Sequence, residues 1–377
     1  MRIVHVGKFY PPEYHGGLES VVALLNDELV RRGVDVTAIV AAVNGPTRVD
    51  THLGARIVRA RSLGVAFSQP LAPALGRLVR AEPGDVVHLH HPNPLGDLAV
   101  LGERRPLVVT QHSDIVRQRL LRPVYGPLVR RVLARARAIT VGSEQYLRAS
   151  AELHGFEATT RVIPFGIDPA RFALTPALAE TARRLREEWG GRPVVLAVGR
   201  LVAYKGLDVL VRAARGLAAT VVIVGSGPEE ARLRALAGER GRVGGGDGGG
   251  PEVVFAGRVT DDLLVAHFHA ADVFCLPSLT IAEAFGMVLL EAMACAKPLV
   301  TTRLPTGVSA INREGVTGLA VPPDDAGALR EALGAVLGDG PRRDAMGRAA
   351  RAVLEAEYTA ARMGERFLSL YRELVAA

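Results

Sequence analysis

Short runs of β-branched and other apolar residues alternate with helix-length segments along almost the whole chain of 377 residues. The first series of such runs covers residues 3–6, 34–40, 86–89, 107–110 and 138–141. The second series covers residues 193–198, 220–224, 253–256, 273–276, 299–301 and 319–321. This alternation indicates repeated βα units and parallel sheets, and domains of about 150 residues fit the length. We therefore expect two Rossmann-like, doubly wound α/β domains.

A turn-rich stretch between the two series marks the domain boundary. Residues 163–169 read Ile-Pro-Phe-Gly-Ile-Asp-Pro, which is typical of an exit from a strand. We place an N-terminal domain at residues 1–168 and a C-terminal domain at 169–355. The pattern after Pro341 is helical, and we expect the segment 356–377 to pack back across the domains. The glycine-rich run 241–250 is expected to be a flexible surface insertion.

Composition excludes several classes of protein. With 49% hydrophobic and 23% charged residues, the chain differs from disordered and collagen-like sequences. Cys275 and Cys295, its two cysteines, lie in apolar runs, which speaks against a disulfide framework or a cysteine zinc site. The N-terminus enters a strand pattern without the segments of a signal peptide, and no apolar run approaches the ~18 residues of a membrane span. We expect a cytoplasmic protein.

The chain is basic, with a formal net charge of +7 from 46 lysine and arginine residues against 39 acidic ones. Only Lys8, Lys205 and Lys297 are lysine. A basic chain favours an anionic partner, which could be a nucleotide, a phosphorylated lipid, a membrane surface or nucleic acid. No zinc finger and no basic motif with interleaved aromatic residues is present, so we expect no nucleic-acid partner.

The common phosphate-binding motifs are missing from the expected strand ends, where ligands of open α/β sheets bind. Residues 7–17 contain neither the dinucleotide Gly-x-Gly-x-x-Gly spacing nor a P-loop. Gly225 and Gly227 follow a strand, but Glu230 stands where the third glycine would be. No Asp-x-Asp pair, the usual carboxylate clamp for a metal-bound nucleotide, occurs in the chain. We therefore expect no metal.

Two cations stand together after the expected strand 193–198. Arg200 can fork onto phosphate oxygens, and Lys205, near the start of the next helix, adds a compact charge. Together they could neutralise a diphosphate without a metal. The alternative is that both are ordinary surface cations beside a turn.

Two glutamates, eight residues apart, follow the expected strand 273–276. A helix beginning near Phe285 would offer free N–H groups and a positive dipole end, and Gly286 would allow a ligand to approach closely. Glu283 stands just outside that helix end, and Glu291 lies about two turns further along among apolar residues. A buried carboxylate needs hydrogen-bond donors, and sugar hydroxyls are such donors. The alternative for either glutamate is an internal salt bridge.

These segments together resemble the retaining glycosyltransferases of family 4, from one end of the chain to the other. The motifs that carry the resemblance are Gly16-Gly17-x-Glu19, Arg200 with Lys205-Gly206, and Glu283-x7-Glu291 enclosing Phe285-Gly286. Further matching pieces are Thr110-x-His112-Ser113-Asp114, residues 162–168, Gly225-x-Gly227-Pro228 and residues 318–323. Residues 112–118 resemble bacterial mannosyltransferase-type members that build surface polysaccharide.

The resemblance implies a GT-B fold, in which two Rossmann-like domains face each other across a cleft. The C-terminal domain of such enzymes binds a nucleotide-diphosphate sugar, and the N-terminal domain binds a glycan or lipid-linked acceptor. It also implies transfer with retention of anomeric configuration and without metal, the donor phosphate accepting the acceptor's proton. GDP-mannose and a UDP-sugar both stay open as donors.

The same resemblance implies roles for individual residues. Arg200 and Lys205 would hold the diphosphate, Glu291 the ribose hydroxyls, and Glu283 the transferred sugar. The remaining implied contacts are the amides of Phe285, Gly286 and Met287 with sugar or phosphate, Val259 with the base, Gly16 and Gly17 with the diphosphate, and His112 with the donor sugar. A core histidine is the alternative for His112. Phe165 departs from the asparagine of many relatives, and we expect it to leave donor chemistry untouched.

Other interpretations stay open. A nucleotide-sugar epimerase could use the same scaffold, and it would act on its donor with no acceptor present. Residues 115–142 contain seven arginines and no acidic residue, and the seven are Arg117, Arg119, Arg122, Arg130, Arg131, Arg135 and Arg137. This basic face could attach the protein peripherally to an anionic membrane, at the inner face of the plasma membrane, or it could simply be solvated.

Overall fold

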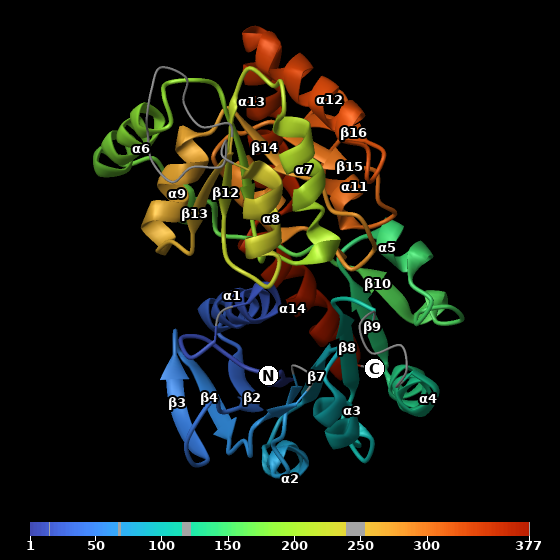
Figure 1. Cartoon of the computed structure of the whole chain (residues 1–377). Helices are drawn as coiled ribbons and strands as arrows, with labels where there is room; N and C mark the ends of the chain where they lie inside the picture. The colour runs from blue at the N-terminus through green and yellow to red at the C-terminus, as the bar shows by residue number, and fades with distance from the viewer. Residues whose placement is uncertain (15, 67–68, 115–121, 239–252, 377) are drawn as a thin grey trace. The chain divides into compact units, whose positions relative to one another are not determined.

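The computed structural model describes every residue except 15, 67–68, 115–121, 239–252 and 377. The chain forms two compact units (Figure 1). The first comprises Met1–Ile167 together with Tyr358–Ala377, and the second comprises Asp168–Glu357. The C-terminal segment, which we expected to pack across both domains, thus belongs to the first unit. The glycine-rich run 241–250 lies outside the described residues.

An eight-stranded sheet forms the centre of the first unit, in the order β10-β9-β8-β7-β1-β2-β4-β3. Its strands are β1 (Arg2–Val6), β2 (Asp35–Ala41), β3 (Arg48–His52), β4 (Ala55–Ala60), β7 (Val86–His91), β8 (Leu107–Gln111), β9 (Ala138–Val141) and β10 (Thr160–Val162). A separate pair consists of β5 (Val65–Ala66) and β6 (Gln69–Pro70). The expected strands are confirmed, and they are buried along almost their whole length because helices cover a parallel sheet on both faces.

The edge strand β3 corrects the expectation of an all-parallel sheet, because it runs antiparallel to β4. Leu53 and Gly54 join the two strands with φ angles of 49° and 85°, the left-handed geometry of a tight hairpin turn. The sequence signal was weak because β3 reads Arg-Val-Asp-Thr-His, with little apolar character, and because the turn lacks an Asn-Gly or Asp-Gly pair.

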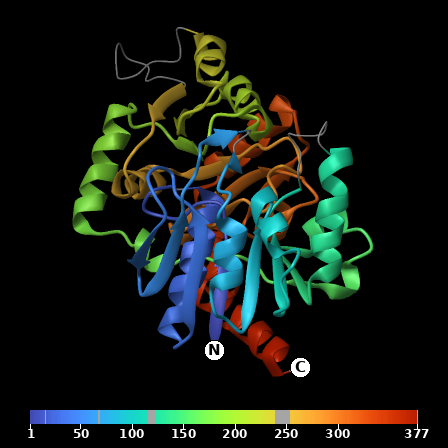
Figure 2. The same cartoon turned by 90° about the horizontal axis from the view of Figure 1, so that it is seen from below.

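The helices of the first unit are α1 (Gly17–Arg31), α2 (Leu75–Ala81), α3 (Pro94–Val100), α4 (Arg122–Arg135), α5 (Glu144–Ala149) and α14 (Ala360–Ala376). Both chain ends belong to this unit, the N-terminus at β1 and the C-terminus after α14 (Figure 2). Helix α14 lies against α1 and β7. Phe367 and Tyr371 of α14 are buried, as the apolar stripe in the sequence predicted. None of the described helices is long and apolar enough to cross a membrane.

A six-stranded, wholly parallel sheet forms the centre of the second unit, in the order β13-β12-β11-β14-β15-β16. The strands are β11 (Val194–Val198), β12 (Thr220–Val224), β13 (Val253–Gly257), β14 (Val273–Leu276), β15 (Leu299–Thr302) and β16 (Gly318–Val321). The helices are α6 (Pro176–Glu188), α7 (Leu207–Ala214), α8 (Glu230–Ala237), α9 (Asp261–Ala270), α10 (Met287–Ala294), α11 (Gly307–Ile311), α12 (Ala326–Gly338) and α13 (Gly340–Glu357). All six expected strands are confirmed.

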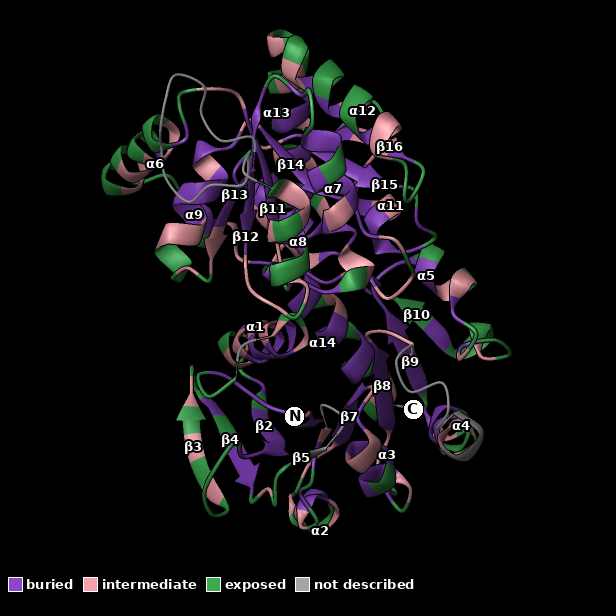
Figure 3. Cartoon of the chain, in the orientation of Figure 1, coloured by how far each residue is buried: buried purple, intermediate pink, exposed green. Residues whose placement is uncertain are grey.

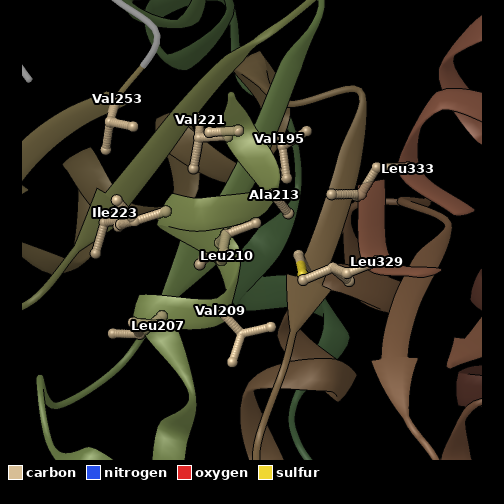
Figure 4. Close-up of a cluster of buried hydrophobic side chains, with 14 of the residues drawn as sticks. Val195, Leu207, Val209, Leu210, Ala213, Val221, Ile223, Val253, Leu329 and Leu333 are labelled. Atoms are coloured by element: carbon tan, nitrogen blue, oxygen red, sulfur yellow. The ribbon is translucent and has the colours of Figure 1, made fainter. Parts of the chain in front are cut away.

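The core of the second unit lies between this sheet and the helices on its faces. Leu210 of α7 and Leu329 of α12 share a buried cluster with Val195, Val221 and Ile223 of the strands (Figure 4). Burying one such side chain contributes about 1.5–3 kcal/mol, so this cluster fixes the strand ends that carry the polar residues. Apart from the edge strands β3 and β10, the sheets of both units are largely buried, whereas exposed residues concentrate on the outer faces of the helices (Figure 3).

Each sheet has a point at which the chain reverses its direction of travel across the sheet. In the second unit the chain goes outward from β11 to β12 and β13 and then returns to β14 on the other side of β11. In the first unit the corresponding neighbours are β1 and β7. Ligands of open α/β sheets bind at the carboxyl ends of strands beside such a point. The segments after β11 and β14 contain Arg200, Lys205 and Glu283.

Candidate active site

Glycine residues pack the loops after β11 and β12 against each other. A side chain at Gly225 would lie 2.0 Å from the Gly199 carbonyl oxygen, and one at Gly227 would lie 2.3 Å from that of Leu201. The Leu201 N–H donates to the Ser226 carbonyl at 3.0 Å. Gly225 and Gly227 therefore serve backbone packing, which explains why this Gly-x-Gly lacks the rest of a dinucleotide fingerprint.

Lys205 lies at the end of a 3₁₀ turn, η4 (Ala203–Lys205), directly before α7. Gly206 follows with φ +63°, and a side chain there would lie 2.1 Å from the Pro277 carbonyl oxygen. This close approach joins the loop after β11 to the loop after β14. It explains why glycine follows the lysine, and it brings the Lys205 amine to Glu283.

Lys205 and Glu283 form an ion pair between Nζ and Oε2. Ser278 Oγ donates to the same carboxylate oxygen at 3.0 Å. The two side chains of the pair are only 12% and 10% exposed. Burial opposes the lysine's charge, but Glu283 outweighs it and raises the pKa of Lys205 above its ordinary value. The internal salt bridge that the sequence left open as an alternative for Glu283 is therefore present in the structure.

Arg200, directly after β11, is exposed. Within the described part of the chain its guanidinium has no hydrogen-bond or ion-pair partner, unlike that of Arg212 on the following helix. The two cations predicted from the sequence therefore differ: Lys205 is buried and paired, and Arg200 is exposed with its donors available to an anion.

Helix α10 begins with an unusually bare end. Its N-cap, Gly286, has φ +85° and supplies no side-chain hydrogen bond, so the first-turn amides of Met287 and Val288 lack an acceptor within the helix. Gly286 is packed tightly, because a side chain would meet Leu289 at 3.1 Å. Phe285 is buried. The expected helix start near Phe285 is confirmed within two residues, and its geometry suits an anion.

Glu291 lies two turns into α10 and is half-buried. Its pKa is raised to about 7, mainly by burial. The positive charges of Arg171 and Lys205 lower this pKa in part, and the negative charge of Asp261 raises it further. No described residue donates a hydrogen bond to its carboxylate. This carboxyl group can therefore accept further hydrogen bonds, and it lies near the loop after β11 that carries Lys205.

Val259 follows β13 and is half-buried. The strand ends at Gly257, which has φ +68° and whose carbonyl accepts the Gly225 N–H at 2.7 Å. This bond ties the segment before Val259 to the loop after β12. The backbone of residues 257–259 thus belongs to the same carboxyl edge of the second unit's sheet.

The first unit carries Gly16 and Gly17 at the start of α1. Gly16 is the N-cap, and a side chain there would lie 2.4 Å from the Glu19 carboxylate, which folds back over it. Gly17 is exposed and has open space around its α-carbon. Burial raises the pKa of Glu19, and Lys8 lowers it in part. The helix start is thus open at Gly17 and covered by a carboxylate at Gly16.

His112 follows β8 in the first unit, and it is half-buried. Its Nε2 lies 3.0 Å from His90 Nδ1, and burial lowers its pKa to about 3, so the ring is neutral at ordinary pH. Phe165 stacks on the ring with the centroids 5.0 Å apart. We expected Phe165 to leave donor chemistry untouched. In the structure its ring lies against His112, a predicted site residue, because the segment after β10 lies beside the end of β8.

Sequence reasoning missed the histidines of β7. His88, His90 and His91 end this buried strand, and His5 lies on the neighbouring strand β1. The signal was available, since a His-x-His-His run at the carboxyl end of an apolar strand is unusual. His91 donates from Nδ1 to Asp97 at 3.0 Å and lies 3.7 Å from Glu152. Although burial opposes it, these carboxylates raise the pKa of His91 to about 9.

Two family models match the chain. The model described as "Glycosyltransferase Family 4" matches residues 15–171 in the first unit, and the model described as "Glycosyl transferases group 1" matches residues 180–353 in the second. The two matches cover every site residue that was predicted from the sequence, whereas His5 lies before the first match.

Three curated relatives align over nearly their whole length. O-antigen chain mannosyltransferase C of Escherichia coli is 33% identical, covering 100% of this chain and 99% of its own. The D-rhamnosyltransferase WbpZ of Pseudomonas aeruginosa is 35% identical, covering 96% and 93%. The GDP-mannose-dependent alpha-(1-6)-phosphatidylinositol monomannoside mannosyltransferase of Mycolicibacterium smegmatis is 32% identical, covering 91% of each.

Among solved structures, the sucrose-phosphate synthase of Thermosynechococcus elongatus superposes with a TM-score of 0.79 at 22% identity. The superposition covers 100% of this chain and 99% of that one. At this level of identity the likeness speaks for the fold alone, which is GT-B, as the sequence resemblance implied.

Proposed function

The chain belongs to glycosyltransferase family 4 and transfers a sugar from a nucleotide sugar; on that premise we propose that the sugar is mannose and the donor GDP-mannose. The acceptor in this proposal is a hydroxyl of a glycan or lipid-linked molecule, and the anomeric configuration is retained. Two of the three relatives are mannosyltransferases by name, and one of them is named as GDP-mannose-dependent. Rhamnose is the nearest alternative sugar, after the name of the third.

The observation that carries the proposal is the set of positive groups at the chain reversal between β11 and β14. Arg200 is exposed beside β11, Lys205 is the buried amine of the next loop, and α10 begins with free amides. In the reaction, negative charge develops on the leaving diphosphate, and preorganised donors stabilise that charge as it forms. We propose that these groups neutralise the diphosphate and that transfer therefore needs no metal.

The ion pair suggests how Lys205 and Glu283 divide their work. An arriving diphosphate competes with Glu283 for the Lys205 amine, because both are anions and the amine is largely buried. Once the amine has bound phosphate, the Glu283 carboxylate is free to accept hydrogen bonds from hydroxyls of the transferred sugar. Binding of the diphosphate thereby prepares the carboxylate for the sugar attached to it.

Glu291 is proposed to accept hydrogen bonds from the ribose hydroxyls, since none of the described residues donates a hydrogen bond to its carboxylate. The amides of residues 285–287 contact sugar or phosphate, and the backbone at Val259 contacts the base. Gly17, with open space around it, lets phosphate approach the start of α1. The donor phosphate takes the proton of the attacking hydroxyl, and His112 orients the sugar by a hydrogen bond.

Transfer from GDP-mannose labelled with ¹³C at the anomeric carbon tests this proposal. The acceptors are a series of alkyl mannosides, and the one-bond carbon–proton coupling of the product reports its anomeric configuration. We expect an α-linked product, since the donor is α-linked, with the same rate in excess EDTA. A β-linked product would contradict retention, and isomerisation of the donor without acceptor would instead support an epimerase.

A lipid-linked acceptor would require the protein to approach a membrane, and α4 carries a suitable surface. Val129, Val132 and Leu133 of α4 are buried, whereas Arg130 and Arg131 are exposed, as is Arg137 after the helix. Arg117 and Arg119 lie outside the described residues. We propose that this basic face contacts anionic lipid, each surface cation contributing about 1 kcal/mol near an acidic surface.

A further inference from the structure

Five of the chain's ten histidines meet at the carboxyl edge of the first unit's sheet. His5 is on β1, His88, His90 and His91 are on β7, and His112 follows β8. These strands are neighbours, and His5 pairs in register with His88. His5, His88 and His90 are at most 1% exposed. Buried polar side chains at such density require an ordered pattern of hydrogen bonds.

Three of the rings form a continuous hydrogen-bonded chain. His112 Nε2 lies 3.0 Å from His90 Nδ1, and His90 Nε2 lies 2.9 Å from His5 Nδ1. The chain ends inside the protein at His5 Nε2, which is buried and has no partner among the described residues. At its outer end, the chain leaves His112 Nδ1 without a described partner.

His88 stands beside this chain but does not belong to it. Its Nδ1 bonds the Tyr371 hydroxyl and its Nε2 bonds Thr110 Oγ1, both at 2.6 Å. Suitable nitrogens of His5, His88 and His90 lie within 4.8 Å of one another, which invites comparison with a metal site. However, every ring nitrogen of the three except His5 Nε2 already has a partner, so the cluster is satisfied as a hydrogen-bonded network.

All three rings of the chain are neutral. Burial lowers the pKa of His5 and His112 to about 3 and that of His90 well below its ordinary value. A neutral imidazole carries one N–H, so it donates from one nitrogen and accepts at the other. The tautomer of any one of the three rings therefore determines the tautomers of the other two.

Only two proton arrangements satisfy both bonds. In the first, His5 donates to His90 and His90 donates to His112, which leaves a bare nitrogen at His5 Nε2 and an N–H at His112 Nδ1. In the second, every donor is reversed, which leaves an N–H at His5 Nε2 and a bare nitrogen at His112 Nδ1. The second arrangement buries the Nε2–H of His5 without an acceptor, and orphaned buried N–H groups are rare in proteins.

We propose that His5 and His90 are positioning residues that fix the tautomer of His112, so that its Nδ1–H is presented as a hydrogen-bond donor to a hydroxyl oxygen of the transferred sugar. The tautomer follows from the protein's own bonds, and only the identity of the acceptor oxygen rests on the proposed function. In this state His112 cannot abstract the acceptor's proton through Nδ1. Its role is to hold an oxygen in place.

Long-range ¹H–¹⁵N correlation spectra of the full chain, labelled with ¹⁵N-histidine, distinguish the two tautomers of each ring. The signals of His112 are identified by their loss in His112→Gln. We expect Nδ1–H in the parent, and an Nε2–H tautomer of His112 would overturn the proposal. Because this spectrum needs neither donor nor acceptor, it decides the inference whether or not the proposed reaction is correct.

We call the three hydrogen-bonded rings of His5, His90 and His112 the histidine relay. Two variants test whether the relay sets the tautomer of His112, and a third variant serves as a control. His90→Phe removes the direct partner, and His5→Phe removes the ring that imposes the direction; we expect either to turn the single tautomer of His112 into a mixture. His154→Gln, at an exposed histidine, should change nothing. A single Nδ1–H tautomer surviving in a folded His90→Phe protein would show that the relay does not set it.

A kinetic comparison separates positioning from packing. Loss of one ordered hydrogen bond to the sugar should lower kcat/KM for the donor about tenfold in His90→Phe while leaving GDP affinity unchanged. If His90→Phe instead weakened GDP binding as much as it slowed transfer, the relay would be serving the stability of the first unit and not the sugar contact.

Discussion

Replacing Lys205 by Ala should cost more than a phosphate contact, because it leaves the buried Glu283 carboxylate without its counter-ion. Removing one partner of a buried ion pair typically destabilises a protein by about 3–5 kcal/mol. Ser278 still donates to Glu283, and the pair is 10–12% exposed, so the lower end of that range applies. For a unit of this size, about 3 kcal/mol corresponds to a fall in melting temperature of roughly 6–12 °C.

The matched variant is the double substitution Lys205→Met with Glu283→Gln. It buries no net charge, so its melting temperature should recover most of the loss, whereas its affinity for GDP should stay below that of the parent because the Lys205 amine is missing. Thermal unfolding of the full chain and calorimetric titration with GDP measure the two effects. A Lys205→Ala protein that melts with the parent, or a double variant no more stable than the single one, would refute the account of the pair.

Four further outcomes follow from the same site and from the basic face. Glu291→Gln should weaken GDP binding about 10–100-fold, since a hydrogen bond to a charged group contributes about 1.5–3 kcal/mol. Glu283→Gln should lower turnover, while its affinity for GDP should equal or exceed that of the parent. Because the pKa of Glu291 is raised to about 7, GDP affinity should rise as the pH increases through 7, and Glu291→Gln should abolish that rise. Replacing Arg130, Arg131 and Arg137 by Gln should reduce co-sedimentation with anionic vesicles at low salt. Vesicle binding that these substitutions leave unchanged would show that the basic face is merely solvated. The matched control makes the same change at three exposed arginines of other helices, Arg342, Arg348 and Arg362.

The raised pKa of Glu291 also affects how the free energy of unfolding depends on pH. Its folded pKa of about 7 lies above the ordinary value of 4.5, so the folded state binds more protons between these values. Stability from this group therefore falls as the pH rises through that window and is constant above it. Glu291→Gln should flatten that part of the stability profile, which thermal unfolding at several pH values measures.

Periodicity predicted the parallel strands except β4 and β10, because a strand buried on both faces reads as a continuous apolar run. The same rule missed β3, which is an edge strand with polar residues and an antiparallel partner. Motif spacing brought out Arg200, Lys205, Glu283 and Glu291 as candidates because all four lie in the segments after β11 and β14. It did not reveal that Lys205 and Glu283 are paired, since that contact depends on Gly206 lying against the Pro277 carbonyl.

The histidine relay was hidden for a different reason. His5, His90 and His112 come from three strands that are far apart in the sequence, and only the strand order β8-β7-β1 brings them together. A single sequence carries no signal for that order. The stacking of Phe165 on His112 was missed on the same grounds, because it depends on the end of β10 lying beside those strands.

The central claim is that the second unit holds a nucleoside diphosphate with its own cations. A thermal-shift panel of GDP, UDP, ADP and their sugar conjugates, run in excess EDTA, tests it most directly. Ligand at about 100 times its Kd stabilises the native state by about 2.7 kcal/mol. The account predicts that GDP and GDP-mannose raise the melting temperature most, and that Arg200→Ala reduces the shift. A protein whose melting temperature responds to none of these nucleotides in EDTA, yet responds when Mg²⁺ is added, would contradict it.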